Sequence, residues 1–155
     1  MKNFLIAFLF ILITGCGFNP IYSEKNLDKF DISIENLGIN GDRTASIFFK
    51  NKLNKYSSKE TKNSINLNLN SKVNRNIKTK DSKGNASSYE LILNVSATAS
   101  NNEGNIFEIF YQEEFEYETI TNKAQLKEYE KTIIQNLAEN ILNKIIMDIE
   151  NRTWS

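Results

Sequence analysis

A two-residue alternation of apolar and polar side chains between residues 65 and 78 constrains the fold of this chain more than any other feature. The apolar positions are Ile65, Leu67, Leu69, Val73 and Ile77. The polar positions between them are Asn66, Asn68, Asn70, Lys72, Asn74, Asn76 and Lys78. Because successive side chains of a β-strand point to opposite faces, this stretch predicts a long strand with one buried and one polar face.

The alternation resumes twice further along the chain. Residues 81–85 (Asp-Ser-Lys-Gly-Asn) and 101–105 (Asn-Asn-Glu-Gly-Asn) have the composition of hairpin turns. The strand between these turns has an inner face made of Tyr89, Leu91, Leu93, Val95, Ala97 and Ala99. The strand after the second turn continues the pattern, with Glu113 as the exception, through Phe107, Ile109, Tyr111, Phe115 and Tyr117.

Two helices and one more strand are predicted around these hairpins. Residues 31–36 alternate and indicate a short strand, and the Gly- and Asn-rich residues 37–41 indicate a turn. Asp42 can cap a helix that ends near Ser57 or Ser58, and its apolar face is Ala45, Phe48, Phe49, Leu53 and Tyr56. Asn122 can cap a long last helix, and neither Gly nor Pro occurs within residues 121–151.

The predicted order of elements is therefore β-α-β-β-β-α. One sheet face is apolar and each helix carries an apolar stripe, so the simplest packing is an α+β two-layer sandwich with both helices on one sheet face. The first strand returns through a helix and can pair in parallel, which makes the four-stranded sheet mixed. We expect a single domain over residues 31–155.

The first sixteen residues have the pattern of a bacterial lipoprotein leader. Lys2 precedes an uninterrupted apolar run over residues 4–13, which is too short to span a bilayer of about 30 Å as a helix. The run ends at Ile13, and residues 13–16 (Ile-Thr-Gly-Cys) look like a lipobox that ends at Cys16. We expect residues 1–15 to be a signal peptide, Cys16 to be lipidated, and residues 16–30 to form a tether.

Composition excludes several classes of function. The chain has no His and one Cys, so the commonest general base is absent and neither an intramolecular disulfide nor a cysteine zinc site can form. The 19 basic residues balance the 19 acidic ones, which argues against a general nucleic-acid binder. We expect no catalytic residues, no metal and no cofactor, and a lipid-anchored hydrolase is disfavoured because no His can serve as its base.

The start of the expected mature chain carries a family resemblance. The residues from Cys16 to Tyr22 read Cys-Gly-Phe-Asn-Pro-Ile-Tyr directly at the lipobox. Together with the element order and the size, this resembles the lipopolysaccharide (LPS)-assembly lipoprotein LptE family. The resemblance implies an outer-membrane lipoprotein that plugs an LptD-like β-barrel, supports its assembly and binds LPS during delivery to the outer leaflet. Its domain would lie on the periplasmic side or inside the barrel lumen.

Two surfaces fit that function, and each has an alternative explanation. The Asn-rich strand face suits a polar barrel interior, but it is equally consistent with a solvated sheet face. Residues 71–85 hold five cations against one anion, Asp81. For LPS binding we expect Arg75, Lys78, Lys80 and Lys83 to contact the phosphates of the glycolipid.

The alternative for this basic hairpin is pairing with the acidic residues 103–118, which contain six Glu and no Lys or Arg. Arg75 has the parity of the apolar face, so its charge must pair, reach water or meet a ligand. The alternative function for the whole chain is that of an accessory lipoprotein in another envelope lipid-transport or barrel-assembly system.

Overall fold

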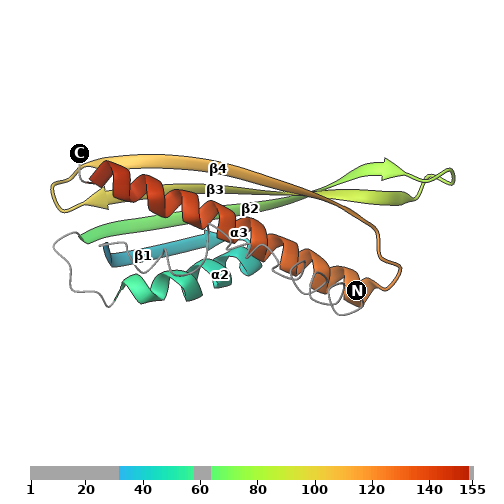
Figure 1. Cartoon of the computed structure of the whole chain (residues 1–155), viewed down its shortest axis with the longest axis horizontal. Helices are drawn as coiled ribbons and strands as arrows, with labels where there is room; N and C mark the ends of the chain where they lie inside the picture. Colours follow the sequence, from blue (N-terminus) through green and yellow to red (C-terminus); the bar gives the residue numbers. More distant parts are fainter. Residues whose placement is uncertain (1–31, 58–63, 154–155) are drawn as a thin grey trace, which may run out of the picture. The chain divides into compact units, whose positions relative to one another are not determined.

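The computed structural model describes residues 32–57 and 64–153. Its elements, in chain order, are β1 (Ser33–Gly41), α2 (Arg43–Leu53), the 3-10 turn η2 (Asn54–Tyr56), β2 (Ser64–Lys80), β3 (Ala86–Asn101), β4 (Ile106–Glu118) and α3 (Lys123–Thr153) (Figure 1). The predicted order β-α-β-β-β-α is confirmed. The expected signal peptide, Cys16 and the tether lie outside the described residues.

The four strands form one mixed sheet in the order β1-β2-β3-β4. β1 runs parallel to β2, whereas β2 with β3 and β3 with β4 are antiparallel. The two antiparallel connections are the tight turns predicted at residues 81–85 and 101–105, where Gly84 and Gly104 adopt positive φ. The sequence alternation therefore placed all three long strands correctly.

The core lies between one sheet face and the two helices. α2 packs on β1 and against α3, and α3 packs across β3 and β4. The inner sheet face contributes buried aliphatic side chains, among them Ile65, Leu67, Leu69, Leu93 and Val95. The helices contribute Ala45, Phe49, Leu53, Ile133, Leu137, Ala138, Ile141, Leu142, Ile145 and Ile149. The predicted two-layer sandwich is confirmed.

The turn expected at residues 37–41 is wrong, because these residues continue β1. Their backbone pairs in parallel with β2 from Leu37 opposite Leu67 to Gly41 opposite Ser71. Gly41, at φ +104°, ends the strand, and the N–H of Asp42 donates to the Ser71 carbonyl at 3.0 Å. Gly and Asn indicate turns locally, but here the ladder with β2 satisfies the backbone groups.

Both predicted helix caps are present. Asp42 Oδ1 accepts from the N–H groups of Thr44 at 2.9 Å and Ala45 at 3.0 Å. Asn122 Oδ1 accepts from the N–H groups of Ala124 at 2.9 Å and Gln125 at 3.2 Å. These bonds satisfy donors that have no partner within the helix, and so fix where each helix begins.

Towards its turn, the β2–β3 hairpin extends beyond the part of the sheet that α2 and α3 cover. Residues 75–80 of β2 are all exposed, and the inward-facing Ile77 is 53% exposed. Phe115, which is also inward-facing on β4, is 44% exposed. At the end of the hairpin, no helix of the described residues therefore covers the inner face of the strand pair.

Candidate functional site

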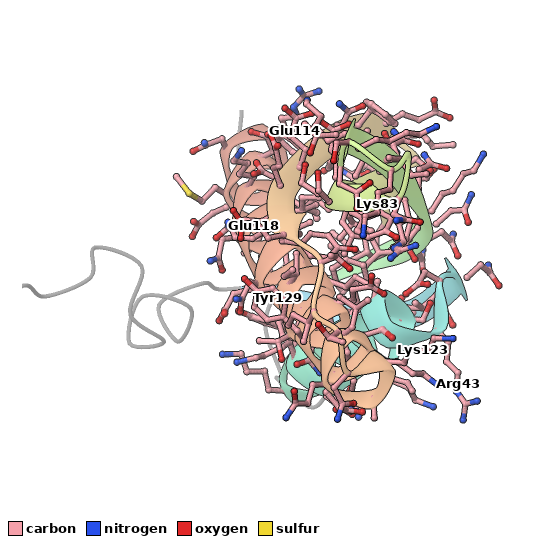
Figure 2. The ribbon with its side chains drawn as sticks, turned by 90° about the vertical axis from the view of Figure 1, so that its right-hand side faces the viewer. Arg43, Lys83, Glu114, Glu118, Lys123 and Tyr129 are labelled. Atoms are coloured by element: carbon pink, nitrogen blue, oxygen red, sulfur yellow. The ribbon has the colours of Figure 1, made fainter. Side chains whose placement is uncertain are left out.

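The turn at residues 81–85 is organised by its own acid rather than by ion pairs with its lysines. Asp81 Oδ1 accepts from the backbone N–H groups of Lys83 and Asn85, both at 2.8 Å. The N–H of Asn85 is the main cause that holds the pKa of Asp81 below its usual value. Figure 2 views the domain from the hairpin end, with Lys83 labelled at this turn.

Lys80 and Lys83 are unpaired cations close to the turn of the hairpin. Both are exposed, and neither ammonium group has an ion pair or hydrogen bond within residues 32–57 and 64–153. Lys78 differs, because its Nζ lies 2.7 Å from Glu90 Oε1 on β3. The hydrogen bond with Glu90 raises the pKa of Lys78 and lowers that of Glu90.

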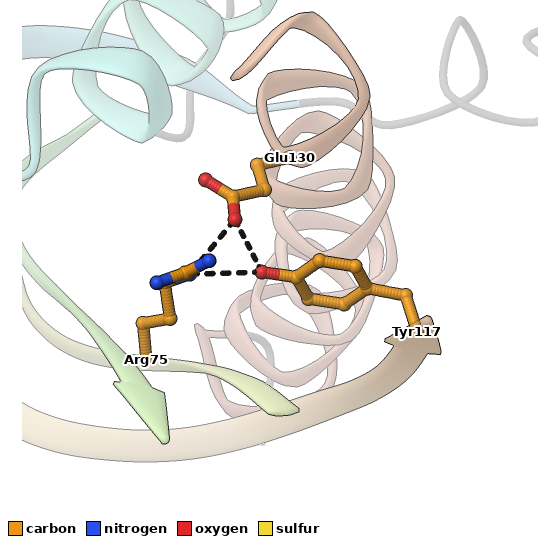
Figure 3. A network of polar contacts seen from close by, with 3 residues as sticks. All are labelled: Arg75, Tyr117 and Glu130. Carbon is orange, nitrogen blue, oxygen red and sulfur yellow. Dashed lines mark hydrogen bonds and ion pairs between the residues drawn. The ribbon is translucent and has the colours of Figure 1, made fainter. Parts of the chain in front are cut away.

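Arg75 lies at the base of the hairpin in a network that joins three strands and a helix. Figure 3 shows its contacts with Tyr117 and Glu130. Its Nε donates to Glu130 Oε1 of α3 at 2.8 Å and to the Tyr117 hydroxyl of β4 at 3.1 Å. The Tyr117 hydroxyl donates to the same Glu130 oxygen. The guanidinium carbon lies 3.5 Å from the centroid of the Tyr89 ring, a cation–π distance.

The network changes the acidity of its members. Burial and the hydrogen bond to Glu130 raise the pKa of Tyr117 to about 12. Burial acts to lower the pKa of Arg75, but the hydrogen bond with Tyr117 and the charges around it outweigh that effect and raise it. Arg75 is therefore a fixed cation whose side chain is still 39% exposed.

The four hypothesised cations thus fall into three environments rather than one cluster. Lys80 and Lys83 are free at the tip, Lys78 is paired, and Arg75 is bound at the base. The alternative, pairing with the acidic fourth strand, does not describe the two ion pairs, since Lys78 pairs with Glu90 of β3 and Arg75 pairs with Glu130 of α3. The inward-facing Glu113 of β4 instead bonds with Lys144 of α3.

An open depression of about 750 Å³ lies beside this base. It is lined by Thr79, Ser87, Ser88, Glu116, Tyr117, Glu118 and Thr119. Hydroxyl and carboxylate groups dominate this lining. No group of three or more metal-ligating side chains occurs within the described residues.

The outer sheet face is the second candidate surface. Across the strands its rungs are Asn36–Asn66–Ser100, Gly38–Asn68–Thr98 and Asn40–Asn70–Ser96. The amide of Asn36 donates to Asn66 Oδ1 at 2.6 Å, so neighbouring rung side chains are hydrogen-bonded across strands. No described helix covers this face, which over β1, β2 and β3 is mostly neutral and polar, with charges at Lys72, Lys78 and Glu90 and an apolar side chain at Ile92.

No helix in the described ranges combines the length and apolar character needed to cross a membrane. The apolar stripe of α3 is buried against β3 and β4 of the sheet.

Solved structures with this fold come from several bacteria. Rare lipoprotein B from Shewanella oneidensis is 17% identical, with a TM-score of 0.54 over 75% of this chain and 97% of that one. A putative lipoprotein from Caulobacter crescentus is 12% identical, with a TM-score of 0.51 over 79% and 91%. Lipoprotein B from Nitrosomonas europaea is 12% identical, with a TM-score of 0.52 over 81% and 88%. At these identities the likeness establishes the fold alone, a fold found in small α+β lipoproteins.

The family follows from the sequence. A family model described as LptE, lipopolysaccharide-assembly, matches residues 35–149, which is most of the chain. The chain therefore belongs to the LptE family of lipopolysaccharide-assembly lipoproteins, which are not enzymes. No curated protein sequence gave a significant match.

Proposed function

We propose that this protein is an outer-membrane lipoprotein that plugs an LptD-like β-barrel, supports its assembly and binds LPS during delivery to the outer leaflet. The observation that carries the proposal is an uncovered polar sheet face in a member of an LPS-assembly family. The domain would act on the periplasmic side or inside the barrel lumen. None of these three roles requires a cofactor.

The polar sheet face supports contact with a barrel interior. Lumens of outer-membrane barrels are polar, so a plug needs hydrogen-bonding side chains rather than an apolar patch. The Asn, Ser and Thr rungs over β1, β2 and β3 provide donors and acceptors without net charge. Most of the apolar face is not available for this contact, because α2 and α3 cover it except near the end of the hairpin.

Site-specific crosslinking tests the barrel contact. A photocrosslinking residue at Asn68 or Asn74 on the outer face should capture the co-expressed barrel. The same residue at Ile141, which is fully buried against the sheet, should not. Equal capture from both kinds of site would contradict the proposal.

The hairpin tip supports LPS binding. LPS presents phosphates, and ammonium groups bind phosphates through charge-assisted hydrogen bonds. Lys80 and Lys83 have no competing acid among the described residues, whereas Lys78 and Arg75 would have to share or exchange Glu90 and Glu130. We therefore assign the main phosphate contacts to Lys80 and Lys83, with Lys78 and Arg75 contributing.

Two triple charge-reversal variants test this assignment. Lys78→Glu/Lys80→Glu/Lys83→Glu should weaken binding of purified LPS by well over tenfold at moderate salt. The matched control Lys72→Glu/Lys123→Glu/Lys127→Glu makes the same change in net charge away from the tip and should bind nearly as well as the wild type. Raising the salt concentration should weaken wild-type binding, because exposed charges are screened over about 8–10 Å.

If both triple variants lose affinity equally, general charge rather than the tip drives binding. If the tip variant binds normally but unfolds at a lower temperature, the lysines serve only intramolecular pairing.

The anchor is proposed to be a lipid on Cys16, with cleavage after Gly15. Cys16→Ser should leave an uncleaved precursor that takes up no labelled fatty acid. Normal processing and labelling of that variant would refute the lipid anchor while leaving the barrel and LPS experiments unaffected.

A further inference from the structure

β4 is an edge strand, and no other strand among residues 32–57 and 64–153 pairs with its outer side. The sheet order β1-β2-β3-β4 leaves it with a single neighbour, β3. Its 13 residues pair with β3 without a register shift. A long, regular edge of this kind presents a row of unpaired backbone groups to any extended chain.

The turn bonds identify which backbone groups are free. Asn101 donates to the Asn105 carbonyl at 3.1 Å, and Thr119 donates to the Ser87 carbonyl at 2.9 Å. Hydrogen-bonded pairs alternate in an antiparallel ladder, so the odd-numbered residues of β4 bond to β3. The N–H and C=O groups of the even-numbered residues from Glu108 to Glu118 therefore point to the open edge.

The two edges of the sheet differ in length and in regularity. β1 is shorter and its pairing shifts register between Ile34 and Asn36. β4 contains no Pro, Lys or bulge, which are the usual devices that block an edge. Its one inward-facing charge, Glu113, is already bonded to Lys144 and does not repel an incoming strand.

Side chains along β4 indicate what would bind there. Ile106 and Phe110 are 69% and 65% exposed on the outer face, and Phe115 is the half-exposed residue on the inner face. Glu108, Glu114 and Glu118 have no ion pair within the part of the chain that the structure describes. Glu114 and Glu118 lie on the side of the domain away from Arg43 (Figure 2).

We propose that the open edge of β4 binds an extended basic segment of a partner protein as a fifth strand. Its backbone would bond to the even-numbered residues of β4. Side chains of adjacent strands lie about 4.5–5.5 Å apart, so alternate Lys or Arg residues would stand beside the glutamates. Apolar residues between them would cover Phe115 on the inner face. Backbone bonds would supply affinity, and the charge pattern would supply selectivity.

Two synthetic peptides test the proposal on the purified full-length chain in detergent micelles. One is nine residues of alternating Lys and Val, and the other alternates Glu and Val. The basic peptide should slow amide exchange at Phe110, Gln112 and Glu114 at least tenfold, leaving Ile109, Tyr111 and Glu113 unchanged. The acidic peptide should slow none of them. Protection without this alternation, or equal protection by both peptides, would overturn the proposal.

Two variants sharpen the test. Gln112→Pro removes an edge-facing N–H without touching the ladder to β3, and should weaken peptide binding at least tenfold. Gln112→Thr keeps the N–H and should bind as the wild type does. Should the proline variant not fold, Glu108→Lys/Glu114→Lys supplies the answer, because its preference should switch to the acidic peptide.

Exchange protection that rises with protein concentration in the absence of peptide would assign the edge to a second copy of this chain. That result would overturn the proposal of a basic partner segment.

Discussion

Arg75 is a charged residue on the inner face of a sheet, and its neighbours explain how the fold accommodates it. Its Nε is shared by Glu130 and Tyr117, and Tyr89 covers the guanidinium. An exposed ion pair alone contributes little, about 0–1 kcal/mol. Here the pair is joined to a buried hydroxyl and a ring contact, so it ties the base of the hairpin to α3.

The raised pKa of Tyr117 predicts a loss of stability in alkali. The folded state favours the neutral phenol, with a pKa of about 12 against an ordinary value near 10. Its contribution is therefore complete below pH 10 and is lost as the pH rises through 12. Two pKa units correspond to about 2–3 kcal/mol. Urea unfolding of the wild type from pH 9 to pH 12 should show this decline.

Tyr117→Phe is the control for that prediction. It should be less stable at neutral pH by about 1–3 kcal/mol, because Arg75 and Glu130 lose a partner. The difference in the free energy of unfolding between the wild type and the variant should then become smaller above pH 10. A difference that stays constant to pH 12 would show that the phenol does not titrate as described.

The position of Arg75 in the alternation of β2 showed that this charge on the apolar face needs a partner, but it did not show which residue that partner is. Glu130 is 55 residues away, and only the diagonal path of α3 brings it to the hairpin. Pairing with the acidic fourth strand was the alternative for Lys78, but the register places Glu90 of β3 beside it. Glu113, the exception in the β4 alternation, is explained by Lys144, which a one-dimensional pattern does not reveal.

Among the elements, the junction between β1 and α2 is the most constrained. Gly41 has φ +104°, and a Cβ there would lie 1.9 Å from the Ser71 carbonyl oxygen. Gly41→Ala should therefore destabilise the domain by at least about 2 kcal/mol in urea unfolding, since both strain and a backbone clash are introduced.

Gly84→Ala is the matched control. Gly84 also has a positive φ, +84°, but no atom lies within 4 Å of the added Cβ. Only the left-handed conformation is penalised, by roughly 1–2 kcal/mol. If the two variants lose the same amount of stability, the clash with the Ser71 carbonyl does not add to the destabilisation.

Local periodicity predicted the antiparallel meander and α3 well, because adjacent strands and long helices carry their own patterns. It failed at residues 37–41, where the strand depends on a parallel partner that begins at Ser64. It also extended the first helix slightly, since α2 ends at Leu53 and tightens into η2. Non-local pairing and helix ends are the features that short-range patterns describe least well.

On the scale of the whole molecule, the fold should not depend on the leader or the anchor. All core residues named above lie within residues 32–149. Residues 17–155, produced without lipid, should be soluble and should give a mixed α/β circular dichroism spectrum. An all-helical or unfolded spectrum would contradict this expectation.

The position of α3 at the end of the chain has a consequence for biogenesis. A chain made and delivered N-terminus first completes its four strands at Glu118, before the helix that covers β3 and β4 exists. Until the last 31-residue element is available, an aliphatic sheet surface faces water and can aggregate. We therefore expect the nascent protein to depend on a holding chaperone for that interval, and a premature stop before Ile133 should yield a degraded product rather than a shorter working one.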